Sequence, residues 1–489
     1  MANLKKLTLL HSNDLHGDFL AEEVNGKLMG GVSRLSGYVQ KVRAEEENVL
    51  YAISGDMLQG SVIDSEYRGI STIEIMNMIG PDVATLGNHE VDYGLGHLLF
   101  IEKCARFPIV NANMYLVNNR KRLFNSHVIL EIGGMKVMFI GILTEDVLAM
   151  TRQEKIVGTF VDVLEAAAEV GRICDSYQTE DIDFTVLLTH IGFEEDKALA
   201  AALDPRWGVD VIIGGHSHTL LEEPAVVNGI PIVQAACGTD QIGRFDFVVD
   251  TDRNAIESYE WRLVPIDSEN CPRDEALERL VAKYKQATDE IYCRYVTRFE
   301  RELTHPRRDR ESELGRLFAD VLRDSLRLDI MMVGSGSLRN TVMGPLVEYQ
   351  DLVEMYPYND EIYRVVVNGA MLKGMLERVF REESFEGEHT EMYQYSRGLE
   401  ILCSAPERRM IEVSFEGEPI ADDRLFRIGL QSYHFKNMED SFGLTLEEAG
   451  SIEPPKVVVT STIDVLDEHF SMQELVKCPA DLRWRTIEG

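Results

Sequence analysis

Short apolar runs that end abruptly in polar residues recur through the first 265 residues of the chain. Residues 83–86 are one such run, and residues 87–94, with the sequence GNHEVDYG, follow it directly. An amide, an imidazole and two carboxylates at the end of a buried strand each need a partner, because an unpaired polar group there is costly. For a lone cluster we favour a polar loop that caps the next helix. A metal or catalytic site requires support from the rest of the chain.

The apolar runs alternate with segments of helical periodicity, such as Val32, Leu35, Val39 and Val42. This alternation predicts an α/β architecture in which helices cover a largely buried sheet. The expected strands are residues 7–10, 49–53, 83–86, 109–110, 137–142, 184–188, 209–213 and 232–233.

Five of these runs are followed by Asp, Asn or His. In open α/β sheets the carboxyl ends of the strands line the ligand crevice, so side chains 200 residues apart in sequence can converge there. We therefore predict one metal site built from seven oxygen or nitrogen ligands and no thiolate. The candidate ligands are Asp14, His16, Asp56, Asn88, His190, His216 and His218.

This ligand set suits two divalent ions of the Mn, Zn, Co or Fe kind better than Ca or Mg, which prefer oxygen ligands alone. We expect Asp56 to bridge the two ions. A water between ions about 3.5 to 4 Å apart is then the nucleophile for in-line attack on a phosphoryl group. Asp14, His16 and His218 are predicted to complete one side, and Asn88, His190 and His216 the other.

The remaining side chains of residues 87–94 receive separate roles. His89 is left free to contact the leaving oxygen and to stabilise the transition state, and Asp92 can orient it. Glu90 has no ligand role in the two-metal assignment, so we expect it to support the loop or a ligating histidine.

Bulk properties narrow the range of partners. The 83 acidic and 49 basic residues give a formal charge of -34, which argues against nucleic acid or an anionic membrane as a partner. A small phosphorylated substrate is compatible, because bound cations or a few arginines can invert the field locally. No apolar run approaches the ~18 residues of a membrane helix, and the N-terminal apolar patch is too short for a signal peptide, so we expect a cytoplasmic protein. The oligomeric state stays open.

The length of 489 residues predicts more than one domain. Near Pro272, which fits a first helical position, the pattern changes to a long amphipathic helix, and a polar breaker follows at residues 305–308. We expect a first domain over residues 1–270, a linker helix and hinge over 271–312, and a second α/β or α+β domain over 313–489.

The motifs DLHG, SGDMLQGS, GNHEVDYG, TH and GGHSHT occur in that order. Together they resemble the calcineurin-like metallophosphoesterase domain, and with the second domain they resemble the bacterial 5'-nucleotidase and UDP-sugar hydrolase family. The protein phosphatase branch fits less well, because the second motif lacks its Asp-Arg pair. The resemblance implies a four-layer αββα sandwich followed by an α/β (α+β) substrate-binding domain.

The resemblance also implies a nucleotide site in the second domain. Residues 334–339, GSGSLR, stand where the family has NGGGIR, so Arg339 matches a phosphate-binding arginine and Gly334 replaces an asparagine that contacts the base. Without the resemblance, core packing is the favoured explanation for Tyr358 and Phe435, and a solvated surface explains Arg327 and Arg339 as well as a binding role does. The candidate substrate-binding residues are Arg327, Arg339, Tyr358, Arg397, Tyr433, Phe435 and Asp440, with Tyr433 and Phe435 as alternatives for the second stacking ring.

Three functions are therefore considered. The first is a dinuclear-metal 5'-nucleotidase that hydrolyses nucleoside 5'-monophosphates. The second is a 2',3'-cyclic nucleotide phosphodiesterase or nucleotide-sugar pyrophosphatase, which the altered Gly334 and Arg397 regions would suit. The third, a catalytically silent metal-binding scaffold, is least favoured because no ligand is missing.

Overall fold

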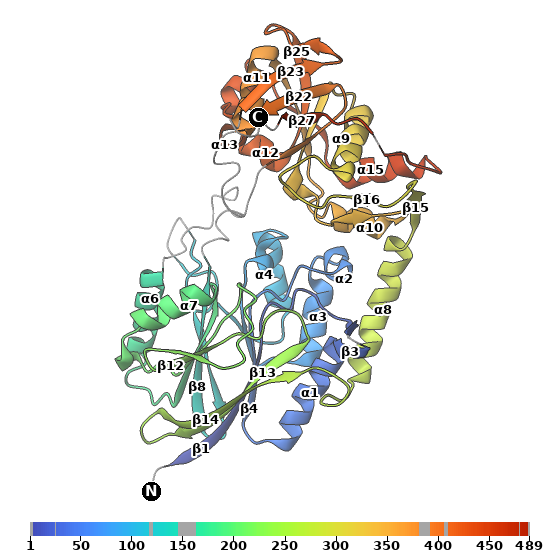
Figure 1. Ribbon diagram of the computed structural model, residues 1–489. Coiled ribbons are helices and arrows are strands. Elements are labelled where there is room, and N and C mark those ends of the chain that lie inside the picture. The colour runs from blue at the N-terminus through green and yellow to red at the C-terminus, as the bar shows by residue number, and fades with distance from the viewer. Residues whose placement is uncertain are drawn as a thin grey trace. The chain divides into compact units, whose positions relative to one another are not determined.

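The computed structural model describes residues 3–24, 26–116, 121–144, 163–380, 392–404, 409–478 and 480–487. The chain separates into two compact units, Met1–Thr288 and Asp289–Gly489, each with its own hydrophobic cores (Figure 1). The boundary between the units falls within the helix that the sequence suggested as a linker. The expected domain limits at residues 270 and 312 stay predictions.

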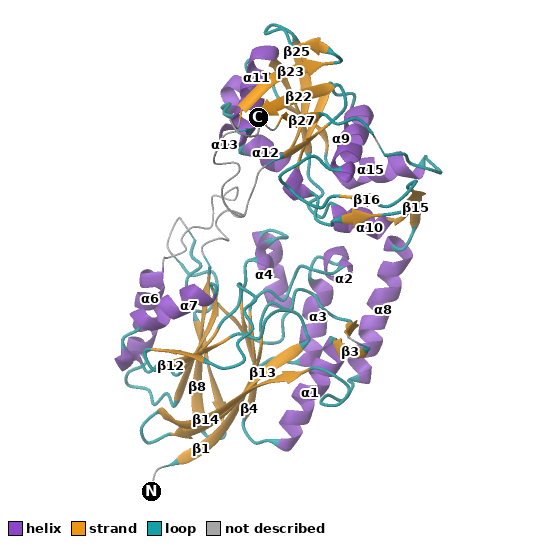
Figure 2. Cartoon of the chain, in the orientation of Figure 1, coloured by secondary structure: helices purple, strands orange, loops and turns teal. Residues whose placement is uncertain are grey.

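Unit 1 contains two six-stranded sheets packed face to face (Figure 2). Alternation along β1 shows how the layers form: Leu9 packs in the core between the sheets, whereas Leu10 faces the helices on the outer side. The first sheet has the order β14 (Ala255–Pro265), β13 (Gln241–Asp250), β1 (Leu4–Ser12), β4 (Val49–Ser54), β5 (Val83–Thr85) and β6 (Ile109–Val110). The second has the order β11 (Ala225–Val227), β12 (Ile230–Val233), β10 (Val211–Ile213), β9 (Phe184–His190), β8 (Met135–Leu143) and β7 (His127–Ile132).

Helices cover the outer face of each sheet, which confirms the predicted four-layer αββα sandwich. On the first sheet lie α1 (Val32–Glu45), α3 (Ile70–Ile79), α4 (Leu95–Cys104) and α8 (Glu275–Tyr292), and on the second lie α6 (Val163–Ser176) and α7 (Phe193–Ala202). Smaller elements are β2 (Ala21–Val24), β3 (Lys27–Gly30), α2 (Val62–Glu66), η1 (His89–Val91) and η2 (Pro205–Trp207).

Strands β1, β4, β5 and β6 run parallel, as do β8, β9, β10 and β12. The order of both sheets thus brings several carboxyl strand ends to one edge of the sandwich.

The start of α8 differs from the expectation. Pro272 does not occupy the first helical position, because the helix begins three residues later at Glu275. The Asp274 carboxylate accepts hydrogen bonds from the backbone N–H groups of Ala276 and Leu277, at 3.1 Å each. An acidic cap therefore defines this helix start, and the proline only precedes it.

Unit 2 is built on a mixed sheet with cores on both faces. The sheet order is β21 (Tyr393–Tyr395), β17 (Ile330–Gly334), β25 (Leu425–Gln431), β20 (Ile362–Asn368) and β26 (Lys456–Val459). A second sheet contains β24 (Glu418–Pro419), β23 (Arg409–Phe415), β22 (Leu399–Ser404) and β27 (Trp484–Ile487), and two ribbons pair β15 (Tyr295–Arg298) with β19 (Leu346–Glu348) and β16 (Leu303–Thr304) with β18 (Val342–Met343). The helices are α9 (Glu313–Leu326), η3 (Ser335–Ser337), α10 (Tyr349–Met355), α11 (Gly369–Val379), α12 (Ser432–Lys436), α13 (Met438–Phe442), α14 (Leu446–Ala449) and α15 (Thr462–Ser471).

Among the described helices, none combines the length and apolar character needed to span a bilayer. The cytoplasmic location stays a prediction.

Candidate active site

The seven predicted ligands lie at the ends of parallel strands of both sheets in unit 1. The structure brings them into one cluster, with donor atoms of Asp14, Asp56 and His190 within 4.8 Å of one another and those of Asp14, His16 and His218 equally close. Asp14 and His16 follow β1, Asp56 follows β4, Asn88 follows β5, His190 ends β9, and His216 and His218 follow β10.

Asp56 occupies the centre of the cluster. Its Oδ2 lies 3.0 Å from His190 Nε2 and 3.8 Å from His16 Nε2, so it faces the histidines of both predicted sides. This central position is compatible with the bridging role that the sequence predicts for Asp56, which stays a prediction.

The other ligands separate into two groups around Asp56. On one side, His218 Nε2 lies 3.4 Å from Asp14 Oδ1 and 3.0 Å from His16 Nε2. On the other side, Asn88 Oδ1 lies 2.8 Å from His216 Nδ1 and 3.2 Å from His190 Nε2.

Backbone carbonyls orient two of the imidazoles. His190 Nδ1 lies 2.9 Å from the Ser54 carbonyl oxygen, and His16 Nδ1 lies 3.0 Å from that of Gln59. When each Nδ1–H donates to its carbonyl, the Nε2 lone pair faces the cluster. This arrangement is common for metal-bound histidine.

The backbone of this cluster is strained. Left-handed conformations are unusual outside glycine and cost roughly 1 to 3 kcal/mol each, and they persist mainly at functional sites. The predicted ligands with positive φ are Asp14 (51°), His16 (47°), Asp56 (50°), His216 (79°) and His218 (52°).

Close packing behind the ligands also restricts the sequence. A Cβ on Gly87 would lie 2.1 Å from Asp56 Oδ1, so only glycine allows the β5 loop to approach the β4 loop this closely.

The electrostatics of the cluster favour a cation. Although burial disfavours a charged His190, the adjacent Asp56 and Asp14 carboxylates raise its pKa to about 9. Both carboxylates are almost completely buried. The cluster thus fits divalent ions of the kind that the sequence predicted. It combines buried negative charge, nitrogen and oxygen donors, and imidazoles whose Nδ1–H groups donate to backbone carbonyls.

His89 lies next to the ligands and has its own partner. Its Nδ1 is 2.6 Å from Asp92 Oδ2, and its backbone N–H donates to Asp56 Oδ1 over 2.9 Å. Burial opposes a charged ring, but the bond to Asp92 and the charge of Asp56 raise the pKa of His89. This geometry orients Nε2–H as a donor, as an acid or oxyanion-stabilising role requires.

Glu90 connects the two loops that carry Asp56 and Asn88. Its side chain is buried and accepts backbone N–H bonds from Asp56 at 3.0 Å, Met57 at 2.8 Å, Leu58 at 3.2 Å and also from Gly87. Glu90 thus supports the loop after β4, as expected, by accepting hydrogen bonds from its backbone N–H groups.

Removing this acceptor is expected to destabilise unit 1. In Glu90→Ala, buried N–H groups lose their partner at a cost of about 1 to 3 kcal/mol each, so we expect a lower melting temperature and weaker manganese retention. Glu90→Gln keeps one acceptor oxygen and should fall in between. Thermal denaturation and metal content of the purified variants check this, with the exposed Glu223→Ala as control. Equal behaviour of Glu90→Ala and the control would contradict the role.

In unit 2, Arg339 and Tyr358 lie together. Arg339 Nη1 donates to the Tyr358 hydroxyl over 3.0 Å, and the guanidinium carbon lies 5.8 Å from the ring centroid. Tyr358 is 55% exposed, so a face of this ring is accessible to a ligand.

The glycine that departs from the family pattern has a structural reason. A Cβ on Gly334 would lie 2.2 Å from His434 Nε2, so no larger residue fits beside that ring. His434 is buried, its Nδ1 lies 2.9 Å from the Tyr393 hydroxyl, and burial lowers its pKa to about 4. A neutral imidazole therefore takes the space next to Gly334.

A methyl group at residue 334 tests this packing. Gly334→Ala is expected to lower the free energy of unfolding by about 1 to 3 kcal/mol, because His434 must move. Gly336→Ala is a matched control in the same loop, since the nearest atom there is Arg308 Nη1 at 4.0 Å. Chemical denaturation should show a penalty in Gly334→Ala that the His434→Ala background relieves. If Gly334→Ala lowered the free energy of unfolding equally in the unchanged and the His434→Ala proteins, the steric explanation would be refuted.

The two candidates for the second ring have different surroundings. Phe435 stacks on Tyr363, with ring centroids 4.1 Å apart and planes 10° apart, and packs against the core. Tyr433 is 56% exposed. Asp440 is also exposed and helps to line a small cavity. Of the two rings, Tyr433 is therefore the one open to a ligand.

Arg327 and Arg397 are not brought together with Arg339. Arg327 precedes β17, whereas the loop of residues 334–339 follows that strand. The Arg397 guanidinium pairs with Asp324 of α9 near the start of β17. The two arginines thus lie at the end of the strand opposite to Arg339.

Arg308 is a candidate that the sequence analysis did not select. Its Nη1 approaches Gly336, and the nearby His305 Nε2 lies 3.1 Å from the Ser335 carbonyl oxygen. The signal was present in the polar breaker at residues 305–308, which the sequence pattern indicated as a hinge or linker.

Comparisons with known proteins agree with this architecture. Residues 7–220 match the calcineurin-like phosphoesterase family, and residues 288–444 match the 5'-nucleotidase C-terminal domain. The chain is 26% identical to mouse 5'-nucleotidase over 507 residues, covering 91% of this chain and 85% of that protein. It is 25% identical over 484 residues to the Bacillus subtilis trifunctional nucleotide phosphoesterase protein YfkN, covering 87% of this chain and 31% of that protein.

Solved structures share the fold. A 5'-nucleotidase precursor from Thermus thermophilus superposes with a TM-score of 0.73 at 24% identity, covering 99% of this chain and 100% of that one. Both domain matches occur in the order that the motifs predicted, and the strand-end cluster lies inside the first match. The chain belongs to the calcineurin-like phosphoesterases that carry a 5'-nucleotidase C-terminal domain, and it is a hydrolase of phosphoric esters.

Proposed function

We propose that the protein is a 5'-nucleotidase that hydrolyses nucleoside 5'-monophosphates with two divalent ions. The observation that carries this proposal is the convergence of the Asp14, Asp56 and His190 donors with the other strand-end ligands in a chain that also has the nucleotidase C-terminal domain. The names of the mouse and YfkN relatives support the nucleotide as substrate.

The proposed ion-holding residues form two sets that share Asp56. Asp14, His16 and His218 would complete one set, and Asn88, His190 and His216 the other. When bound, two divalent ions supply an activated water at neutral pH and offset the charge of a phosphoryl group. The donor set suits manganese, zinc, cobalt and iron alike.

His89 and Asp92 are the proposed proton-handling residues. The Asp92 carboxylate accepts the Nδ1–H of His89 and fixes the ring, so Nε2–H can donate to the leaving oxygen. A positioned acid of this kind contributes about 10²- to 10⁴-fold.

In unit 2, Arg339 is the proposed phosphate ligand, and Tyr358 and Tyr433 are the proposed rings that stack on the base. Both rings are more than half exposed. Base–aromatic stacking contributes about 1 to 3 kcal/mol per base. Arg308 is added as a second cation near the Gly334–Arg339 loop.

The second candidate function is hydrolysis of a 2',3'-cyclic nucleotide or a nucleotide sugar. The Gly334 and His434 pair favours it, because the space of the family's base-contacting asparagine holds a neutral imidazole. A different recognition of the base or sugar follows from that exchange.

A substrate panel separates the two candidates. The manganese-loaded protein should release phosphate from AMP, UMP and GMP with kcat/KM at least tenfold above that for 2',3'-cyclic AMP or UDP-glucose. Faster turnover of the cyclic or sugar substrates would favour the second candidate. Turnover of an aryl phosphate without any nucleotide would refute both.

A further inference from the structure

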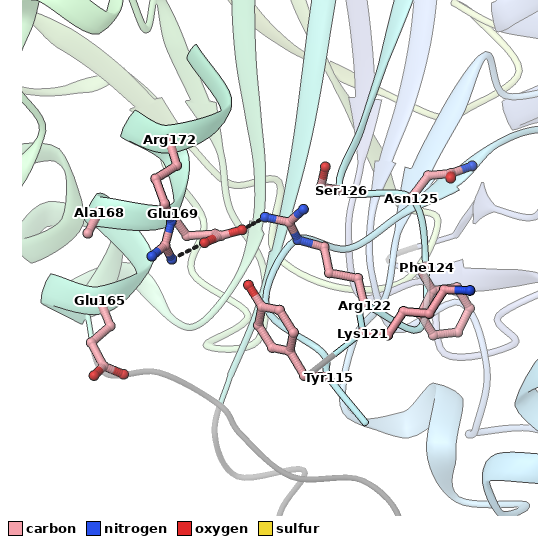
Figure 3. A pocket seen from close by; sticks show the side chains of 10 residues that line it. All are labelled: Tyr115, Lys121, Arg122, Phe124, Asn125, Ser126, Glu165, Ala168, Glu169 and Arg172. Atoms are coloured by element: carbon pink, nitrogen blue, oxygen red, sulfur yellow. Dashed lines mark hydrogen bonds and ion pairs between the residues drawn. The ribbon is translucent and has the colours of Figure 1, made fainter. Parts of the chain in front are cut away.

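A cavity of about 830 Å³ lies in unit 1, lined by the segment that follows β6 and by α6 (Figure 3). Its size is within the range of roughly 300 to 1,000 Å³ that is usual for small-molecule sites. None of the lining residues belongs to the metal cluster or to the His89–Asp92 pair. The cavity is therefore separate from the candidate active site.

Three of the charged side chains that line the cavity form one ion-paired group. Glu169 has a side chain that is only 1% exposed, and it makes ion pairs with both Arg122 and Arg172 (Figure 3). One carboxylate between two guanidiniums leaves one positive charge uncompensated. With Lys121 and Glu165 included, the lining still carries three cations against two anions, in a chain whose net charge is -34.

Arg122 is held in place by contacts other than the ion pair. Its Nε–H donates to the Ala112 carbonyl over 3.2 Å, and its guanidinium carbon lies 5.7 Å from the centroid of the Tyr115 ring. A guanidinium has five N–H donors in a planar fork, so these contacts leave donors available. An oriented guanidinium loses little entropy when it binds an oxyanion.

The remaining lining suits the organic part of a ligand. Tyr115 and Phe124 supply aromatic surface, while Lys121 adds a cation beside them (Figure 3). Guanidinium forks match phosphoryl oxygens, and aromatic rings accept planar or apolar groups. We propose that this cavity is a second binding site for a phosphorylated small molecule, with its phosphoryl group on Arg122 and Arg172.

The phosphoryl group can come from free phosphate or from a phosphorylated metabolite, and calorimetry distinguishes the two. Inorganic phosphate and AMP are titrated separately into the manganese-loaded His89→Asn protein, which should consume AMP only slowly. We expect a binding event whose affinity falls at least tenfold in Arg172→Gln. Its affinity should be the same in Asp56→Asn as in the protein without that substitution. The titrant with the higher affinity for this site identifies the source.

Two further substitutions, Lys121→Gln and Arg206→Gln, test whether the loss of affinity is specific to the cavity. Arg172 is 67% exposed, so its substitution should not prevent folding, which circular dichroism verifies. Lys121→Gln should also weaken the event, whereas the exposed Arg206→Gln, paired with Asp204 elsewhere in unit 1, should not. Absence of this binding event for both titrants, or equal weakening by Arg206→Gln, would overturn the proposal.

Discussion

Replacing Asp56 with asparagine should lower kcat/KM for phosphate release by about a thousandfold or more. Asp56 Oδ2 faces His190 and His16 at 3.0 and 3.8 Å, so its charge serves both proposed ion positions. Metal ions supply several kcal/mol of transition-state stabilisation in such sites, and each 1.4 kcal/mol is about tenfold in rate. Initial rates on AMP, with metal content measured by mass spectrometry, check this result.

The control for Asp56→Asn is Asp204→Asn, which changes a carboxylate elsewhere in unit 1. The control should keep its activity and its metal. If Asp56→Asn retained both ions and the full rate, the bridging role would be wrong.

His89→Asn is expected to lower kcat about 10²- to 10⁴-fold while KM and metal content stay close to those of the unchanged protein. The reason is that His89 contacts Asp92 and the Asp56 side chain but is not one of the proposed ligands. Asp92→Asn should lower kcat less than His89→Asn does. The imidazole remains, and only the carboxylate that orients it and stabilises its positive charge is lost.

Kinetics on AMP across substrate concentrations separate these effects. His97→Asn is the matched control, since His97 lies on α4 and bonds to the Arg68 carbonyl. A His89→Asn protein that lost its metal, or that changed only in KM, would show that His89 positions an ion or the substrate.

The strand-end chemistry was predictable from sequence for a physical reason. Each apolar run of the sandwich ends where the chain must turn. Asp14 and Asp56 follow β1 and β4 directly, and His190 is the last residue of β9. Because parallel strands share one carboxyl edge, order along the chain predicts convergence in space. The alternation predicted the α/β class, and the family resemblance implied the four-layer architecture.

Details that depend on loop approach were not predictable. The direction of the Glu90 carboxylate depends on how closely the β4 and β5 loops pack around Gly87. The start of α8 was assigned to Pro272, whereas the Asp274 carboxylate caps it two positions later. The local sequence pattern indicates that Glu90 supports a loop and that a helix starts near Pro272, but it does not specify the partner of Glu90 or the first residue of the helix.

In unit 2, the positions of several substrate-binding residues predicted from the sequence depend on strand order. Arg327 and Arg397 lie at the opposite end of β17 from Arg339, and only the topology shows this. The exchange of the family's asparagine for Gly334 has its counterpart 100 residues later in His434. No local motif connects those two positions.

Titration of the metal-free protein with manganese tests the central claim most directly, with bound metal and phosphate release from AMP measured in the same samples. The two-ion centre predicts that the protein binds two ions per chain and that activity reaches its plateau only as the second ion binds. Full activity without added metal, or a plateau at one ion per chain, would contradict it.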